Sequence, residues 1–140
     1  LAFQLLLYPV TDLRASALQP LAASAAPPGV LTPALISRVL ELYLARDSDR
    51  DDPRCSPLAA RNLIGLPPAL IISAEHDPLR EQIEAYAQAL RAAHVPVTLS
   101  RYPGVIHGFV HMFALLDRGR EALVECSAAL RTAFGEGLDS

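Results

Sequence analysis

The sequence has 140 residues, enough for one domain with a hydrophobic core. Because 51% of the residues are hydrophobic and 19% are charged, the composition excludes a chain that is disordered over most of its length. The formal net charge is −3, and the sequence predicts neither a nucleic-acid partner nor a polybasic membrane patch. With no signal peptide and no apolar run long enough to span a bilayer, we expect a cytoplasmic protein without a membrane span.

The first half of the chain predicts one strand followed by a long excursion. Residues 2–8 form an apolar run ended by a proline, as in a strand buried on both faces of a parallel sheet. Residues 11–50 are expected to leave the sheet, because their first part is rich in Ala, Ser and Pro and shows no strand period. Within this excursion, Thr32 and Pro33 supply an N-cap and a first-turn proline for an amphipathic helix over about 33–46.

The second half predicts a β-α-β-α unit over residues 69–134. Its expected elements are a strand at 69–74, a helix from Asp77-Pro78 to about His94, a strand at 97–102 and a helix at 117–134. His94 is expected in the left-handed position that ends the first of these helices, because Pro96 forbids continuation. The final helix carries an apolar stripe that includes Leu116, Leu123, Val124 and Leu130.

Strands separated by helices imply parallel pairing with right-handed crossovers. The expected fold class is therefore α/β, with three parallel strands and flanking helices in one partial domain that covers residues 1–140. An apolar strand at an uncovered sheet edge favours association with another chain. Because the chain also opens inside a strand-like run without a methionine, we expect it to be part of a longer protein and its first strand to pair with missing strands or a partner.

No part of the sequence indicates a cofactor or a metal site. Cys55 and Cys126 stand alone, and two free thiols are favoured over a disulfide. The acidic run at 47–52 lacks the central glycine and distal glutamate of an EF-hand calcium loop, so a solvated loop is favoured. His107 and His111 have the spacing of a zinc motif, but glycine occupies the glutamate position and no third ligand is evident.

Asp77 and His107 are the residues that best fit a catalytic role. In open α/β sheets the working residues lie at the carboxyl ends of the strands. Asp77 follows the second strand and His107 follows the third, 30 positions later, so we expect them to be neighbours on one rim. An aspartate that holds a histidine in the correct tautomer is the general-base half of a catalytic triad. Taken singly, Asp77 is also an ordinary helix cap and His107 an ordinary loop histidine.

The nucleophile of such a triad is not in this chain. The hydrolase serine lies in a G-x-S-x-G turn between a strand and a helix, and it precedes the aspartate and the histidine in chain order. None of the nine serines, and neither cysteine, has glycines two positions before and two after it. No HGGG-type oxyanion loop is present either, so we expect the serine to lie upstream of Leu1.

The chain resembles the C-terminal half of the hormone-sensitive-lipase-like family of α/β-hydrolases, in its bacterial carboxylesterase branch. The matching pieces are Leu5-Leu-Leu-Tyr-Pro-Val-Thr-Asp12, Asp52-Pro-Arg-Cys-Ser-Pro-Leu58, Leu66-Pro-Pro-Ala-Leu70, Ala74-Glu-His-Asp-Pro-Leu-Arg80, Ala85-Tyr-Ala-Gln-Ala-Leu90, and Tyr102 through Phe109. The family commonly has Asp-Glu-Gly where this chain has Glu81-Gln82-Ile83, and glycine where His94 stands.

The resemblance implies that Asp77 is the triad acid and His107 the triad base of a serine carboxylesterase. It implies that the three strands are the last three of an eight-stranded sheet, and that the excursion helps to line the acyl or alcohol pocket. The implied substrates are small-molecule esters with short to medium acyl groups, hydrolysed through an acyl-serine without a cofactor. The isolated chain is expected to be inactive.

Two other functions stay open from the sequence. One is a truncated, non-catalytic remnant that binds a partner through its first strand, and the coding sequence before Leu1 would distinguish it from the enzyme. The other is a different α/β-hydrolase branch, such as a peptidase or a lactonase.

Overall fold

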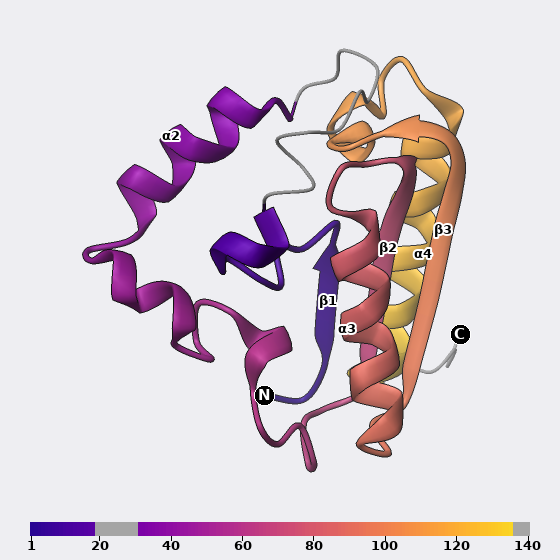
Figure 1. Ribbon diagram of the computed structural model, residues 1–140. Helices are drawn as coiled ribbons and strands as arrows, with labels where there is room; N and C mark the ends of the chain where they lie inside the picture. Colours follow the sequence, from indigo (N-terminus) through magenta and orange to yellow (C-terminus); the bar gives the residue numbers. More distant parts are fainter. Residues whose placement is uncertain (19–30, 136–140) are drawn as a thin grey trace, which may run out of the picture.

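A three-stranded sheet lies between two helices, and a long excursion extends beside it (Figure 1). The computed structural model describes residues 1–18 and 31–135. The strands are β1 (Gln4–Leu7), β2 (Ala69–His76) and β3 (Val97–Ile106), and the helices are α2 (Pro33–Tyr43), α3 (Arg80–Ala92) and α4 (Asp117–Ala133). Short 3-10 helices cover Asp47–Asp51, Pro57–Ala59 and Phe109–Met112.

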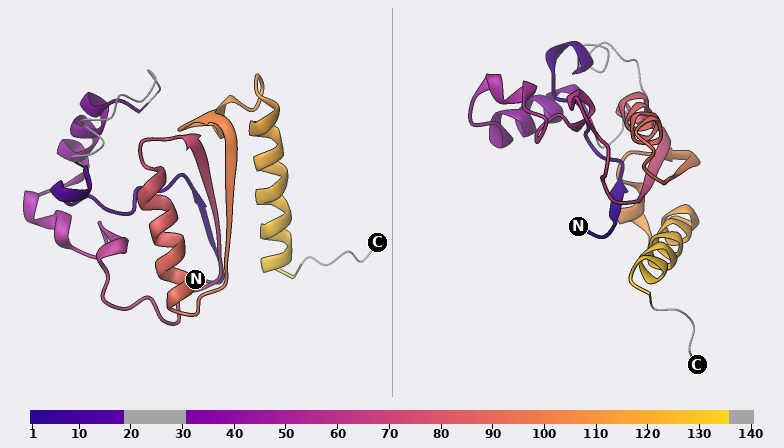
Figure 2. Two further views of the ribbon diagram at one scale, coloured as in Figure 1. Left: turned by 45° about the vertical axis from the view of Figure 1, so that its right-hand side comes forward. Right: turned by 90° about the horizontal axis from the view of Figure 1, so that it is seen from below.

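The sheet is parallel throughout, in the order β1-β2-β3. Leu5 of β1 pairs with Leu70, and Ile71 of β2 pairs with Leu99 of β3. Helix α3 covers one face of the sheet and α4 the other (Figure 2). The predicted α/β fold class is therefore confirmed, although β1 is shorter than the predicted strand at residues 2–8.

Strand β2 forms the centre of the core. Ile71 and Ile72 have no exposed surface, because β2 has a strand on each side and a helix over each face. From α3, the fully buried Ile83, Ala87 and Leu90 pack into the same cluster. A strand buried on both faces has no solvent-facing positions, which explains its continuous apolar run.

Both strands that lead to the predicted site run further than the sequence indicated. Strand β2 continues to His76 and β3 to Ile106, with a shift in pairing register after Ala74. The strand predicted at 97–102 continues through Pro103 and Gly104. In the described sheet β3 is an edge strand, and a proline is tolerated there because an edge need not donate every backbone hydrogen bond.

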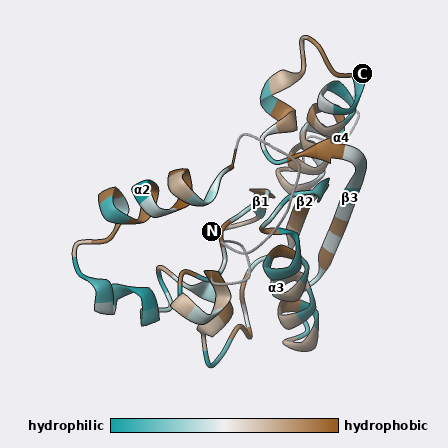
Figure 3. Ribbon diagram, turned by 45° about the horizontal axis from the view of Figure 1, so that its top comes forward, coloured by the Kyte–Doolittle hydropathy of each residue, from teal (hydrophilic) through white to brown (hydrophobic). Residues whose placement is uncertain are grey.

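Helix α2 lies away from the sheet (Figure 1) and carries both apolar and polar segments along its length (Figure 3). Its predicted start is confirmed, since the Thr32 hydroxyl accepts a hydrogen bond from the Leu35 amide at 3.2 Å and Pro33 is the first helical residue. It ends at Tyr43, earlier than the predicted 46, and Leu40 is the residue of its apolar face that is buried. Residues 19–30 of the expected excursion lie outside the described part of the chain.

Helix α4 packs on the sheet with a different face from the one predicted. The expected stripe leaves Leu123 38% exposed and Val124 67% exposed, and the buried positions are Gly119, Ala122 and Cys126. Small side chains let the helix approach its neighbours closely, so the contact face is defined by small residues rather than by large apolar ones.

Two features expected of the chain's other segments appear in the described residues. His94 has a positive φ of 60°, which confirms the predicted left-handed end of α3. Cys55 and Cys126 are free thiols, as the sequence favoured. Within residues 1–18 and 31–135, no helix has the length and apolar character needed to cross a bilayer.

Gln82 holds the segment after β1 against α3. Its side-chain oxygen Oε1 accepts hydrogen bonds from the backbone amides of Thr11 and Asp12, at 2.7 and 2.9 Å. The Thr11 hydroxyl in turn donates to the backbone carbonyl of Gln82 at 2.9 Å. Gln82 is buried, and its amide nitrogen Nε2 has no hydrogen-bond partner among the described residues. Gln82 therefore supplies the acceptor that holds this loop against α3.

Replacing Gln82 with leucine should destabilise the fold, because two buried backbone amides would lose their acceptor. Each unsatisfied buried donor costs about 1–3 kcal/mol, so we expect the free energy of unfolding to fall by about 2–6 kcal/mol. Equilibrium unfolding in urea measures this loss. Gln88→Leu is the matched control, because Gln88 lies on the exposed side of the same helix. Equal stabilities of the two variants would contradict the role given to Gln82.

Replacing Gly119 with alanine should disturb the contact between α4 and the turn that follows His107. A Cβ atom at Gly119 would lie 2.9 Å from the Phe113 Cα and 3.0 Å from the Phe109 carbonyl oxygen, both backbone atoms. Overpacking of this kind costs about 1–3 kcal/mol of unfolding free energy. Ser127→Ala, at an exposed position of α4, provides the control in the same urea experiment. A Gly119→Ala variant as stable as this control would show that the helix can move away without cost.

Candidate active site

Asp77 and His107 meet at the end of the sheet formed by the carboxyl ends of β2 and β3. The His107 Nδ1 atom lies 2.8 Å from the Asp77 Oδ2 atom. The Asp77 side chain has no exposed surface, whereas the His107 side chain is 19% exposed. The His107 Nε2 atom makes no hydrogen bond to any of the described residues. A buried carboxylate thus orients an imidazole whose second nitrogen is available to another group.

Asp77 also has a structural role, although it is not the helix cap that the sequence suggested, because α3 begins at Arg80 with Leu79 as its N-cap. Its second oxygen, Oδ1, accepts a hydrogen bond from the Leu79 amide at 2.8 Å, and its backbone carbonyl accepts one from Arg80 at 3.0 Å. These bonds close the turn before α3, whose own N-cap residue is Leu79. Asp77 can therefore close this turn and orient His107 at the same time, because each oxygen of its carboxylate has a different partner.

The loop that carries His107 is fixed by the glycine after it and by a buried aromatic residue. Gly108 has a φ of 86°, a conformation that L side chains rarely adopt, and it turns the chain from β3 into the 3-10 helix. Phe109 follows with no exposed surface and lies 5.2 Å, between ring centroids, from Tyr102. His107 consequently sits between a strand end and a residue anchored in the core.

Tyr8 is a part of this site that the sequence analysis did not identify. It follows β1, and its ring centroid lies 4.6 Å from that of His107. Its hydroxyl lies 2.8 Å from Nδ1 of His111. Burial raises the pKa of Tyr8, and the nearby Asp77 and Cys126 add to this, so the hydroxyl keeps its proton at neutral pH. Its position in the sequence could have identified it, because Tyr8, like Asp77 and His107, follows the carboxyl end of a strand.

His107 and His111 have the spacing of a zinc motif, but in the structure each binds a different side chain. The two Nδ1 atoms have separate partners, Asp77 for one and Tyr8 for the other. In the described ranges, no three side chains of His, Cys, Asp or Glu gather closely enough to hold a metal ion.

An apolar hollow lies beside this edge of the sheet, under α2. One part, of about 180 Å³, is lined by Val10, Leu13, Val39, Leu40, Tyr43 and Cys55. A smaller part of about 60 Å³ shares several of these residues and reaches Leu79, two positions after Asp77. The hollow therefore adjoins the turn that carries Asp77, and its lining favours an apolar group.

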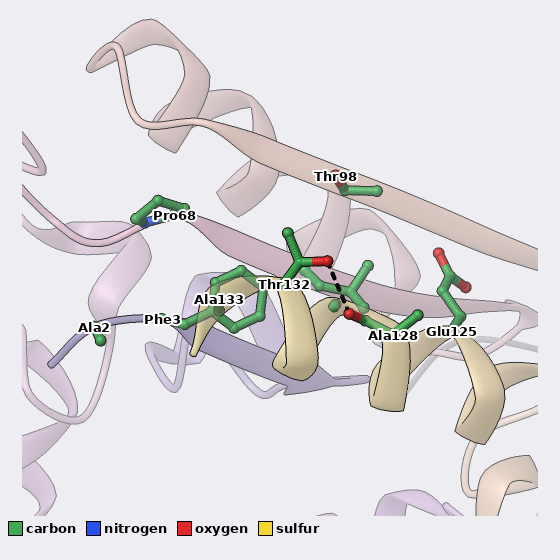
Figure 4. Close-up of a pocket in the computed structure, with 10 residues that line it drawn as sticks. Ala2, Phe3, Pro68, Thr98, Glu125, Ala128, Thr132 and Ala133 are labelled. Atoms are coloured by element: carbon green, nitrogen blue, oxygen red, sulfur yellow. Dashed lines mark hydrogen bonds between the residues drawn. The ribbon is translucent and has the colours of Figure 1, made fainter. Parts of the chain in front are cut away.

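A second, larger hollow lies at the opposite ends of the strands. Its volume is about 530 Å³, and Figure 4 shows it between the start of the chain, near Phe3, and the last turns of α4, near Thr132. Pro68 and Thr98 mark the beginnings of β2 and β3 in its wall. In sheets of this kind chemistry takes place at the carboxyl ends of the strands, so size alone does not make this hollow the active site.

Comparisons with known proteins agree with this geometry. Residues 1–111 match a family of proteins described by the α/β-hydrolase fold. The chain is 37% identical to the ethyl acetate hydrolase of Pseudomonas putida over 128 residues, which cover 91% of this chain and 40% of that protein. It is 39% identical to the carboxylesterase NlhH of Mycobacterium tuberculosis over 138 residues, with 96% of this chain and 42% of that protein covered.

Solved esterase structures share the same arrangement of elements. An esterase of Pyrobaculum calidifontis superposes with a TM-score of 0.85 at 35% identity, over 94% of this chain and 43% of that one. The thermostable carboxylesterase EstE1, cloned from a metagenomic library, gives 0.85 at 34% identity, over 95% of this chain and 45% of that one. The chain thus spans about two fifths of the length of these relatives. It belongs to the hormone-sensitive-lipase-like family of α/β-hydrolases, as its sequence motifs predicted.

Proposed function

We propose that this chain supplies the acid and the base of a serine carboxylesterase, with Asp77 as the acid and His107 as the base. The observation that carries the proposal is the 2.8 Å contact between the buried Asp77 carboxylate and the His107 imidazole at neighbouring strand ends. The nucleophilic serine comes from a part of the protein outside these residues. The carboxylesterase names of the relatives support the choice of reaction.

In this mechanism Asp77 fixes the direction of proton transfer. Its Oδ2 atom accepts a hydrogen bond from the N–H group at Nδ1 of His107, which leaves the Nε2 lone pair to take the proton of the serine hydroxyl. As the serine oxygen bonds to the ester carbonyl carbon, the imidazole becomes charged, and the Asp77 carboxylate stabilises that charge. The imidazolium then gives its proton to the departing alcohol, and an attacking water repeats the cycle on the acyl-serine.

We further propose that the excursion at residues 11–50 helps to line the pocket for the acyl or alcohol group. The apolar hollow between α2 and the segment after β1 supports this, because it reaches Leu79 beside the Asp77 turn. Its volume of about 180 Å³ suits a small apolar group. The name of the Pseudomonas putida relative, an ethyl acetate hydrolase, points in the same direction, to esters with short acyl groups.

The first strand is the proposed junction with the rest of the enzyme. In the described sheet β1 has a neighbour on one side, β2, and its other edge is unpaired. An apolar edge of this kind associates with any available strand. We propose that it pairs with the strand that leads into the nucleophile turn, and that this chain associates with itself through the same edge when it is produced alone.

Labelling with a fluorophosphonate, followed by mapping of the modified residue by mass spectrometry, tests the reaction type. We expect the complete gene product to be labelled at one serine and the 140-residue chain to remain unlabelled. His107→Ala should abolish labelling, because the serine loses its base. His76→Ala is the matched control, since His76 ends β2 with an exposed side chain outside the proposed site. Labelling of the 140-residue chain at a defined serine would overturn the proposal.

Substitution of Asp77 by asparagine or alanine separates its two roles. Asparagine keeps an acceptor for the Leu79 amide but presents a donor to His107, which forces the wrong tautomer. We expect Asp77→Asn to lower kcat for ester hydrolysis by about 10⁴-fold with little loss of stability. Alanine should reduce activity similarly and cost a further ~1–3 kcal/mol of unfolding free energy, since the Leu79 amide loses its partner.

The complete gene product serves for both assays, kcat from ester hydrolysis and stability from urea unfolding. If Asp77→Asn retained the activity of the unchanged protein, Asp77 would be a turn residue alone.

A further inference from the structure

Asp77 alone does not fix the plane of the His107 ring. A single hydrogen bond restrains the position of Nδ1, but the imidazole can still tilt about the line between Nδ1 and the carboxylate oxygen. A general base needs its acceptor atom held to within about 0.5 Å and 10–20° of the productive geometry. The partly exposed His107 side chain therefore requires a second contact on its ring face.

Tyr8 provides this contact. Its ring centroid lies 4.6 Å from that of His107, with an angle of 55° between the ring planes. The same ring lies 6.2 Å from Phe109 and 6.1 Å from His111, again between centroids. Tyr8, which directly follows β1, thus lies against every second residue of the turn that begins with His107: His107, Phe109 and His111.

Tyr8 is itself held firmly. It is 7% exposed, and its backbone amide donates to the Ile72 carbonyl at 2.8 Å. Its φ of 40° is unfavourable for a residue with a side chain. Such a conformation persists only where the surroundings impose it, and strain of this kind is concentrated at functional sites.

The tyrosine hydroxyl completes the arrangement by its bond to His111. The hydroxyl, whose pKa is raised by burial, lies 2.8 Å from Nδ1 of His111 and forms a hydrogen bond with it. His111 belongs to the 3-10 helix at Phe109–Met112, directly after the His107 turn. This hydrogen bond therefore links His111, at the end of the turn, to Tyr8, which packs against His107 at the start of the turn.

We propose that Tyr8 is a positioning residue for His107, and that its hydrogen bond to His111 holds the tyrosine ring against the imidazole. This inference rests on the proposed role of His107 as the base. Tyr8 takes no part in proton transfer; it limits the tilt of the imidazole so that Nε2 stays directed at the serine oxygen.

The test uses the complete gene product and a double-mutant cycle on ester hydrolysis. Tyr8→Phe keeps the ring and removes the hydroxyl, and His111→Leu removes the hydrogen-bond partner of that hydroxyl. We expect either change to lower kcat by up to about tenfold at constant KM, as for the loss of one neutral hydrogen bond. The kcat of the double variant should be no lower than that of either single variant, because both substitutions remove the same hydrogen bond. Tyr8→Leu, which also removes the ring contact, should lower kcat by about 10²-fold.

Tyr102→Phe is the matched control. Tyr102 also packs against Phe109, and its hydroxyl donates to Glu125 at 2.7 Å, but that bond lies toward α4 and does not involve His107. We expect its kcat to equal that of the unchanged protein. Unchanged kcat in Tyr8→Phe and Tyr8→Leu, with the unchanged protein active and His107→Ala inactive, would overturn the positioning role while leaving the proposed function intact.

A second readout does not depend on activity. The proton on Nδ1 of His107, followed by nuclear magnetic resonance, should exchange with water faster in Tyr8→Leu than in the unchanged protein, because the ring moves more freely. Tyr102→Phe should leave the exchange rate as it was. Equal exchange in all three proteins would contradict the proposal. If the gene product proved inactive toward esters and phosphonates, the proposed function would fail, and this measurement would still decide whether Tyr8 restrains the ring.

Discussion

The buried carboxylate of Asp77 is the constraint on which the candidate site depends. A carboxylate without exposed surface is costly to bury unless hydrogen bonds satisfy its oxygens. Oδ1 is satisfied by the turn into α3 and Oδ2 by His107 at the end of β3. The same group therefore fixes the start of a helix and the orientation of an imidazole, and removing it should disturb both.

Parallel pairing explains why residues distant in sequence meet at this carboxylate. Each of the three strands ends at the same edge of the sheet, and each is followed there by one side chain of the site: Tyr8 after β1, Asp77 after β2 and His107 after β3. Helices α3 and α4 cover the two faces and make β2 the rigid centre. The apolar hollow under α2 reaches Leu79, which places room for a small apolar group beside the turn that carries Asp77.

Those parts of the fold that depend on local patterns were predictable from the sequence. The apolar run of β2, the Thr32-Pro33 helix start and the left-handed His94 all follow from single-residue preferences. The contact face of α4 was predicted wrongly, because its packing depends on the small residues Gly119 and Ala122, which a search for apolar stripes passes over. Tyr8 escaped prediction for a related reason: its contacts with His107 and His111 are made across the sheet, and no spacing along the chain encodes them.

A crystal structure of the complete gene product would test the central claim most directly, through the distance between Nε2 of His107 and the nearest serine oxygen. We expect one serine, in a strand-to-helix turn beside β1, with its hydroxyl about 2.6–3.2 Å from that nitrogen. Asp77 should remain bound to Nδ1 of the same ring. If no serine lay within reach of Nε2, His107 would have no nucleophile to activate, and the Asp77–His107 pair would be a structural feature of the fold.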